Sequence, residues 1–107
     1  MVDAAAFSRM KPTAYLVNTA RGAIVDHEAL AAALNSGAIA GCALDVHPEE
    51  PLPMSSAMRA FGPEKVILTP HIGWQRVESR QRLVDTVAFN IGAFFAGDRA
   101  GANLVSE

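Results

Sequence analysis

The chain has 107 residues, of which 50% are hydrophobic and 19% charged, and its formal net charge is -2. This length allows one domain at most, and the composition predicts a folded chain rather than a disordered one. The small negative charge and the absence of a Lys/Arg run argue against nucleic acid or an anionic membrane as a partner. No apolar stretch reaches the ~20 residues of a membrane span, and no basic-then-apolar leader opens the chain, so we expect a cytoplasmic location.

A short helix and a short strand are expected first. Asp3 is a typical N-cap for a helix over residues 4–9, and Pro12 stops that helix because the residue before a proline avoids the helical region. The strand over about residues 14–18 is nearly all apolar. Such a pattern is typical of a strand that is covered on both faces of a parallel sheet.

A longer helix and a second strand follow with tight connections. Asp26 is a second N-cap, the apolar residues after it recur at helical spacing, and Gly37 is a typical residue just beyond a helix end. The next strand covers about residues 39–46 and contains the single Cys42, which we interpret as a buried hydrophobic side chain in a reducing compartment. A strand–helix–strand unit of this kind is right-handed and parallel by default.

The second half of the chain begins with a proline-rich loop over residues 48–53, since three prolines in this stretch exclude regular structure. One or two helical turns over residues 54–61 lead to a third strand at about 65–69. The last long element is a helix over about residues 75–95, with one apolar face, and Gly97 ends it. The expected fold class is therefore α/β, with a parallel sheet of about three strands, flanking helices and a long C-terminal helix.

Three polar clusters stand directly after the three predicted strands. Thr19-Ala20-Arg21-Gly22 follows the first strand, Asp45-Val46-His47-Pro48-Glu49-Glu50-Pro51 the second, and Thr69-Pro70-His71-Ile72-Gly73 the third. Open parallel sheets bind their ligands at the carboxyl ends of the strands. We therefore expect the polar side chains of these clusters to meet in one cleft. The candidates for functional roles are Arg21, Asp45, Glu50 and His71.

Each candidate has both a functional and a purely structural interpretation. Arg21 offers two parallel N–H donors to a carboxylate, but an arginine alone on a turn is more commonly a surface residue. His71 alone would be a loop residue satisfied by the backbone, whereas a carboxylate bonded to one ring nitrogen makes an imidazole a proton donor near neutral pH. Glu49 and Glu50 both precede Pro51, and either glutamate alone reads as a solvated loop acid.

The remaining polar residues are assigned by their placement. Asp45 ends a buried strand, where a carboxylate needs a donor such as a ligand amide, a hydroxyl or a helix N-terminus. We interpret His27 as a surface residue at a helix start and His47 as a loop neighbour of the site, each structural rather than catalytic. No His, Cys and Asp residues fall at metal-ligand spacing, so we expect no metal site.

These clusters, in this order and spacing, resemble the NAD-binding domain of the D-isomer-specific 2-hydroxyacid dehydrogenases. The resemblance covers nearly the whole chain, and it implies a partial Rossmann-like parallel sheet. Trp74 and the stretch after it resemble most the glycerate dehydrogenase and hydroxypyruvate reductase branch. The matching stretches are Met10-Lys11-Pro12, Asn18-Thr19-Ala20-Arg21-Gly22, Ala43-Leu44-Asp45-Val46, Glu50-Pro51, Leu68-Thr69-Pro70-His71-Ile72-Gly73, and Arg80-Gln81-Arg82-Leu83.

The resemblance implies a role for each candidate residue. Arg21 would bind the substrate carboxylate and help to polarise the substrate carbonyl. His71 would exchange a proton with the substrate oxygen, and Glu50 would pair with His71 and keep it protonated. Asp45 would accept a hydrogen bond from the nicotinamide carboxamide. The implied catalytic residues are Arg21, Glu50 and His71, and the implied cofactor-binding residues are Thr19, Ala20, Arg21, Asp45, His71 and Gly73.

The resemblance further implies a reaction and a cofactor. The reaction would be the NAD- or NADP-dependent interconversion of a D-2-hydroxy acid and a 2-keto acid, with a glycerate/hydroxypyruvate-like or glyoxylate-like substrate. Half of a parallel sheet exposes an open strand edge and apolar helix faces, so we also expect a homodimer or higher oligomer. The family's glycine-rich turn G-x-G-x-x-G, its ribose-reading residue and most of its substrate domain are absent from this sequence.

The match to only part of the family predicts how the chain is divided. Residues 1–74 resemble the C-terminal half of a dinucleotide-binding domain, and residues 75–107 resemble a helix and tail that would return to the substrate domain. We therefore expect the chain alone to be inactive, because the phosphate-binding turn is absent. The alternative is a truncated or pseudo-enzyme that acts as a dimerising or binding module.

Overall fold

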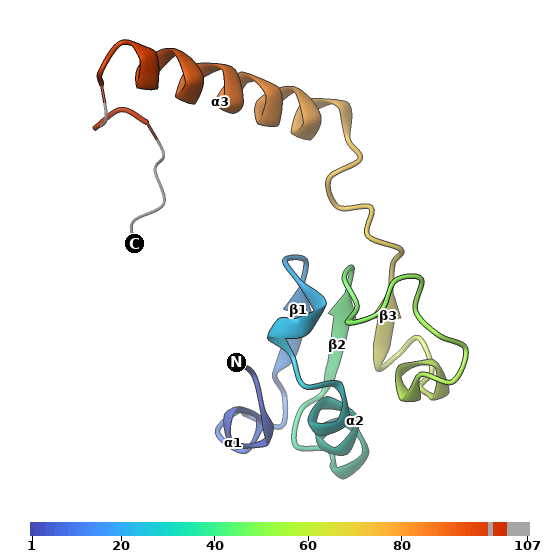
Figure 1. The fold of residues 1–107 in the computed structure, drawn as a ribbon. Helices are drawn as coiled ribbons and strands as arrows, with labels where there is room; N and C mark the ends of the chain where they lie inside the picture. Colours follow the sequence, from blue (N-terminus) through green and yellow to red (C-terminus); the bar gives the residue numbers. More distant parts are fainter. Residues whose placement is uncertain (99, 103–107) are drawn as a thin grey trace. The chain divides into compact units, whose positions relative to one another are not determined.

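A parallel three-stranded sheet organises residues 1–73 in the computed structural model, which describes residues 1–98 and 100–102 (Figure 1). Cys42 on the middle strand lies opposite Leu16 on one side and Val66 on the other, so these side chains form one row across the sheet. The predicted α/β fold class and the parallel sheet are confirmed. In sheet order, the strands are β1 (Tyr15–Asn18), β2 (Gly41–Leu44) and β3 (Val66–Leu68).

Helix α2 (His27–Ser36) connects β1 to β2, and its ends are those that the sequence predicts. The Asp26 side chain accepts hydrogen bonds from two backbone N–H groups of the first turn, at 3.0 Å each, and so caps the helix. Gly37 ends the helix in the left-handed conformation, with φ of +74°. Leu30 and Leu34 lie one turn apart and are fully buried. The N-cap at Asp26, the left-handed Gly37 and the buried leucines therefore all indicate the same bounds and the same buried face for α2.

Several elements are shorter than predicted. The first helix, α1 (Ala4–Phe7), has the predicted Asp3 cap but ends before residue 9, because Arg9 and Met10 bond to carbonyls three residues back, as in a tight turn. β2 ends at Leu44 instead of residue 46, since its neighbour β1 ends at the paired position. Between residues 54 and 61 the helical turns reduce to a 3-10 helix at Ala57–Ala60.

The hydrophobic core lies on one face of the sheet. The prediction that β1 is covered on both faces is wrong for the described structure, because Tyr15 and Val17 are 67% and 66% exposed. Alternate residues of a strand point to opposite faces, and the helices of residues 1–73 cover only the face that carries Leu16 and Cys42. The largest fully buried side chains are Phe7, Leu30, Leu34, Ile39, Leu44, Val46 and Met58.

The residues from Trp74 onward form a second unit, which consists mainly of helix α3 (Val77–Phe95). This helix starts two residues later than predicted and is followed by Gly97 with φ of +77°. None of its residues is buried. Among the residues that the structure describes, no helix is long and apolar enough to span a bilayer. The large apolar side chains exposed on α3 are Val77, Leu83, Val84, Val87, Phe89, Ile91, Phe94 and Phe95.

Candidate functional site

The turn after β1 is closed by Asn18, a residue for which the sequence predicts no functional role. Its buried side chain accepts a hydrogen bond from the Ala20 N–H at 3.1 Å and donates one to the Arg21 carbonyl at 2.9 Å. The Arg21 side chain is exposed, and its guanidinium donates to the Ala20 carbonyl at 2.7 Å. The backbone of Arg21 is thus fixed by Asn18, while its guanidinium stays at the surface.

Gly22 allows this turn to lie against the loop that follows β2. A Cβ atom at Gly22 would stand 2.0 Å from the carbonyl carbon of His47 and 2.3 Å from the nitrogen of Pro48. Real side chains never approach a backbone so closely, so only glycine fits this position. The backbone after Arg21 is therefore held against the loop that carries Glu50.

The structure brings Glu50 and His71 together from the loops after β2 and β3. Nδ1 of His71 lies 2.9 Å from Oε2 of Glu50, and both side chains are 37% exposed. The other carboxylate oxygen of Glu50 accepts a hydrogen bond from the His47 N–H at 2.9 Å. This N–H and, after it, the His71 ring hold the pKa of Glu50 below its ordinary value. The pair has the geometry of a carboxylate-oriented histidine, and its catalytic role stays a prediction.

Asp45 finds its donors in the segment after β3. Its buried carboxylate accepts hydrogen bonds from the Thr69 hydroxyl at 2.5 Å, the Ile72 N–H at 2.9 Å and the Gly73 N–H at 2.8 Å. These bonds, the Thr69 hydroxyl first, hold the pKa of Asp45 below its ordinary value. Of the donors expected for Asp45, a hydroxyl is present and backbone amides supply the rest. A contact with a nicotinamide carboxamide stays a prediction.

The rings of His27 and His47 lie against each other, and His27 differs from its predicted setting. His27 was expected on the surface, but its ring is partly buried, with Nε2 shielded from solvent. The ring centroid of His27 lies 6.4 Å from that of His47, in an edge-to-face arrangement. Burial, and then the neighbouring His47, lower the pKa of His27. The tertiary contact with a loop twenty residues away buries His27, and helical periodicity alone does not report such a contact.

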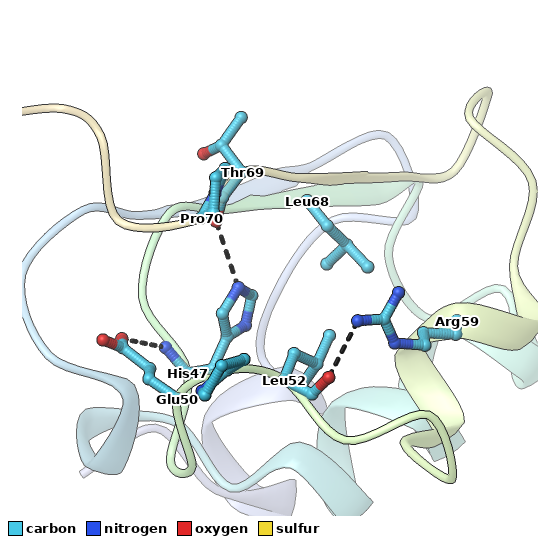
Figure 2. A pocket seen from close by; sticks show the side chains of 8 residues that line it. His47, Glu50, Leu52, Arg59, Leu68, Thr69 and Pro70 are labelled. Atoms are coloured by element: carbon cyan, nitrogen blue, oxygen red, sulfur yellow. Dashed lines mark hydrogen bonds between the residues drawn. The ribbon is translucent and has the colours of Figure 1, made fainter.

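A pocket of about 380 Å³ lies beside the Glu50 loop (Figure 2). The His47 ring stands within it, with Nε2 3.1 Å from the Thr69 carbonyl oxygen. On its far wall Arg59 donates to the Leu52 carbonyl at 2.7 Å and so holds the proline-rich loop. The predicted site residues other than Glu50 are not among those that line this pocket. Its lining residues are His47, Glu50, Pro51, Leu52, Arg59, Leu68, Thr69 and Pro70.

The described residues offer little for metal or thiol chemistry. They contain no group of three or more His, Cys, Asp or Glu side chains that could hold a metal ion. Cys42 is buried in β2, and burial raises the pKa of its thiol to about 11. A thiol with so high a pKa is protonated at neutral pH and is therefore a poor nucleophile.

Comparison with known proteins identifies the family of this chain. Residues 1–73 match the family model described as "D-isomer specific 2-hydroxyacid dehydrogenase, NAD binding domain". The chain is 46% identical over 99 residues to a glyoxylate reductase of Thermofilum pendens, covering 92% of this chain and 29% of that protein. It is 39% identical over 97 residues to a glycerate dehydrogenase of Methylorubrum extorquens, covering 91% of this chain and 31% of that protein. The chain thus spans about a third of the length of these relatives.

Solved structures agree with the sequence matches. A D-isomer specific 2-hydroxyacid dehydrogenase of Xanthobacter autotrophicus Py2, in complex with NADPH and MES, aligns with a TM-score of 0.73 at 35% identity, over 91% of this chain and 38% of that one. An NADPH-dependent glyoxylate/hydroxypyruvate reductase of Sinorhizobium meliloti, in complex with NADP and malonate, aligns with a TM-score of 0.68 at 38% identity, over 88% of this chain and 28% of that one. The expected cofactor class, NAD or NADP, is confirmed for the family. By its family match and by these relatives, the chain belongs to the D-isomer-specific 2-hydroxyacid dehydrogenases.

Proposed function

We propose that this chain supplies the catalytic half of the NAD-binding domain of an enzyme that interconverts a 2-keto acid and a D-2-hydroxy acid of the glyoxylate or hydroxypyruvate type. The observation that carries the proposal is the contact of His71 Nδ1 with Glu50 Oε2 at 2.9 Å, at the carboxyl ends of the strands. Residues 1–74 would form this half-domain, and residues 75–107 would lead back to the substrate domain. The named activities of the relatives support the substrate class.

The described residues fit the nicotinamide end of a dinucleotide. When bound, the reduced cofactor supplies the hydride that the keto carbon gains. Among the described residues, Oδ2 of Asp45 accepts a hydrogen bond from the Gly73 N–H only, which leaves a lone pair that the carboxamide N–H would use. Thr19 and Ala20 are exposed at the end of β1 and would line the same side of the cleft. The G-x-G-x-x-G turn that would hold the pyrophosphate is not in this sequence.

Three side chains would act on the substrate. The Arg21 guanidinium would turn from the Ala20 carbonyl to bind the substrate carboxylate with two parallel N–H groups. Because Nδ1 of His71 bonds to Glu50, the proton would pass from Nε2 to the keto oxygen as the hydride reaches the carbon. The products are then the hydroxy acid and the oxidised cofactor, and His71 regains its proton from solvent. In oxidation, the same histidine would remove the hydroxyl proton.

The role of Glu50 can be tested in the full-length enzyme that carries this segment. Glu50→Gln keeps the size of the side chain but removes the negative charge beside His71. Because Glu50 has a lowered pKa, it is ionised throughout the neutral range in the parent protein. We expect the alkaline limb of the pH profile for keto-acid reduction to move to lower pH by about one to two units, the usual effect of losing an opposite charge at contact distance.

Glu49→Gln is the matched control for this experiment. Glu49 is exposed and lies in the same proline-rich loop, but the described residues show no hydrogen bond or ion pair between Glu49 and His71. Its pH profile should coincide with that of the parent enzyme. If the Glu49 variant moves the alkaline limb and the Glu50 variant leaves it in place, the wrong glutamate has been assigned.

A second candidate function, an assembly module, is favoured by the exposed apolar side chains of this chain. Tyr15, Val17 and Ile67 are exposed on one face of the sheet, and helix α3 contains no buried residue. Apolar faces of this kind are normally covered by another surface. We propose that the chain forms a homodimer or higher oligomer. Sedimentation at tens of micromolar should show an associated species, and a monomer at all concentrations would contradict this.

A further inference from the structure

The segment after β3 wraps around the Asp45 carboxylate. Thr69 donates its hydroxyl to Oδ1 of Asp45, the Ile72 N–H bonds to the same oxygen, and the Gly73 N–H bonds to Oδ2. Two successive backbone N–H groups that point at one anion form a nest, a concavity that binds negative charge. Here the anion in the nest is a side chain of the protein, and His71 lies immediately before the two N–H groups.

His71 has an uncommon backbone conformation. Its φ is +56°, and it is the only residue other than glycine with a positive φ among those that the structure describes. The left-handed region is disfavoured for residues with a Cβ, so such a conformation persists only where neighbouring contacts determine it. The residues that donate to Asp45 lie on both sides of His71, two residues before it and one and two residues after it, so these bonds can fix the backbone at His71.

The close fit at Gly73 supports this interpretation. A Cβ atom at Gly73 would stand 3.0 Å from Oδ2 of Asp45, closer than side-chain carbons normally come to an oxygen. A side chain at position 73 would therefore push the turn and the carboxylate apart. Asp45 is also buried, and a buried carboxylate keeps its charge only where donors surround it.

We propose that Asp45 and Thr69 are positioning residues that hold His71 in its left-handed conformation and thereby aim its ring at Glu50 and at the substrate. The proposal rests on the function proposed above, and it gives Asp45 a role beyond accepting a hydrogen bond from the cofactor. The chain of contacts runs from the end of β2, through the Asp45 carboxylate, to the backbone that carries the proton donor.

The first test is made on this chain and needs no measurement of enzymatic activity. In NMR spectra the backbone amide protons of Ile72 and Gly73 should shift on titration through the pKa of Asp45, which lies below the ordinary value for an aspartate. Thr69→Val has nearly the same shape but lacks the hydroxyl, so its titration midpoint should rise, whereas Thr69→Ser should keep the parent midpoint. His71 also acts electrostatically on Asp45, and His71→Gln separates that contribution. Absence of the titration from both amides would overturn the proposal.

The second test measures the full-length enzyme. Thr69→Val should lower kcat about 10- to 100-fold, the usual cost of misplacing a catalytic group, and should move the alkaline limb of the pH profile while KM for the keto acid stays within twofold. Thr69→Ser should restore both readouts. A merely structural role for Thr69 would lower the melting temperature of the valine variant and leave the pH profile in place, which would count against the proposal.

A cofactor analogue separates positioning from cofactor binding. In 3-acetylpyridine adenine dinucleotide, an acetyl group without an N–H replaces the carboxamide. If Asp45 positions His71, Asp45→Asn should lose the same factor in kcat with this analogue as with the natural cofactor. If the loss disappears with the analogue, Asp45 acts on the carboxamide and the proposal fails.

These tests also distinguish a failure of the inference from a failure of the proposed function. If the Asp45→Asn enzyme does not fold, the Thr69→Val and Thr69→Ser variants are sufficient for the kinetic test. If the amides titrate as expected but His71→Ala leaves the enzyme fully active, the contacts of Asp45 with the His71 segment are supported and the proposed role of His71 is refuted.

Discussion

Replacing His71 by alanine in the full-length enzyme is expected to lower kcat for keto-acid reduction by about 10²–10⁴-fold, the usual contribution of a general acid. The carbonyl oxygen gains negative charge as the carbon accepts hydride, and without His71 only water can supply the proton. The Glu50 carboxylate would then lie near the substrate without its partner His71. Its negative charge would repel the negative charge that develops on the carbonyl oxygen. The measurement is the steady-state rate of cofactor oxidation at saturating keto acid.

His27→Gln is the matched control for the His71 variant. His27 belongs to the same unit of the structure, its ring lies against that of His47, and no step of the proposed mechanism uses it. Its kcat should stay within about twofold of the parent value. An equal loss in both variants would point to a general fault in folding, and full activity of the His71 variant would refute its role as the proton donor.

The second large effect concerns the affinity of this chain alone for the cofactor. We expect NAD(H) to bind with a Kd no tighter than ~1 mM, equivalent to about -4 kcal/mol. Dinucleotide affinity depends strongly on the glycine-rich turn that places the pyrophosphate at a helix N-terminus, and this sequence lacks that turn. The contacts available here, at Thr19, Ala20 and Asp45, lie only at the proposed nicotinamide end.

Titration calorimetry, or fluorescence transfer from Trp74, measures this affinity. Nicotinamide mononucleotide is the informative control, because it contains the end that this chain can contact and lacks the adenosine end. It should bind as weakly as NAD(H) does. A micromolar Kd for NAD(H) together with no measurable binding of the mononucleotide would show that this chain holds the pyrophosphate by contacts that we have not assigned.

The sequence by itself determined the order of the elements and the location of the polar clusters. Asp26 and Gly37 mark the ends of α2 because capping and the left-handed stop are local effects of the chain. Three apolar runs joined by connections long enough for a crossover favour a parallel sheet, because parallel neighbours need such connections. Polar residues placed after each run then necessarily share one edge of the sheet.

The tertiary structure decided contacts that the residues alone leave open. Glu49 and Glu50 both read as solvated loop acids, and only the family resemblance singles out Glu50; the course of the loop is what brings Glu50 to His71. Likewise, the partial burial of His27 results from a contact with a distant loop. Propensity and periodicity report on neighbours along the chain, whereas these contacts depend on where separate loops lie in space.

The open face of β1 and the hydrogen bonds of Asp45 also depend on the tertiary structure. The apolar run of β1 predicts cover on both faces, but in the described residues Tyr15 and Val17 remain exposed, because no helix of residues 1–73 lies on that face. The need of Asp45 for donors follows from its position after a buried strand. That these donors are Thr69, Ile72 and Gly73, on both sides of His71, follows only from the turn that the third loop makes around the carboxylate, because hydrogen bonds between distant segments leave no periodic trace in a sequence.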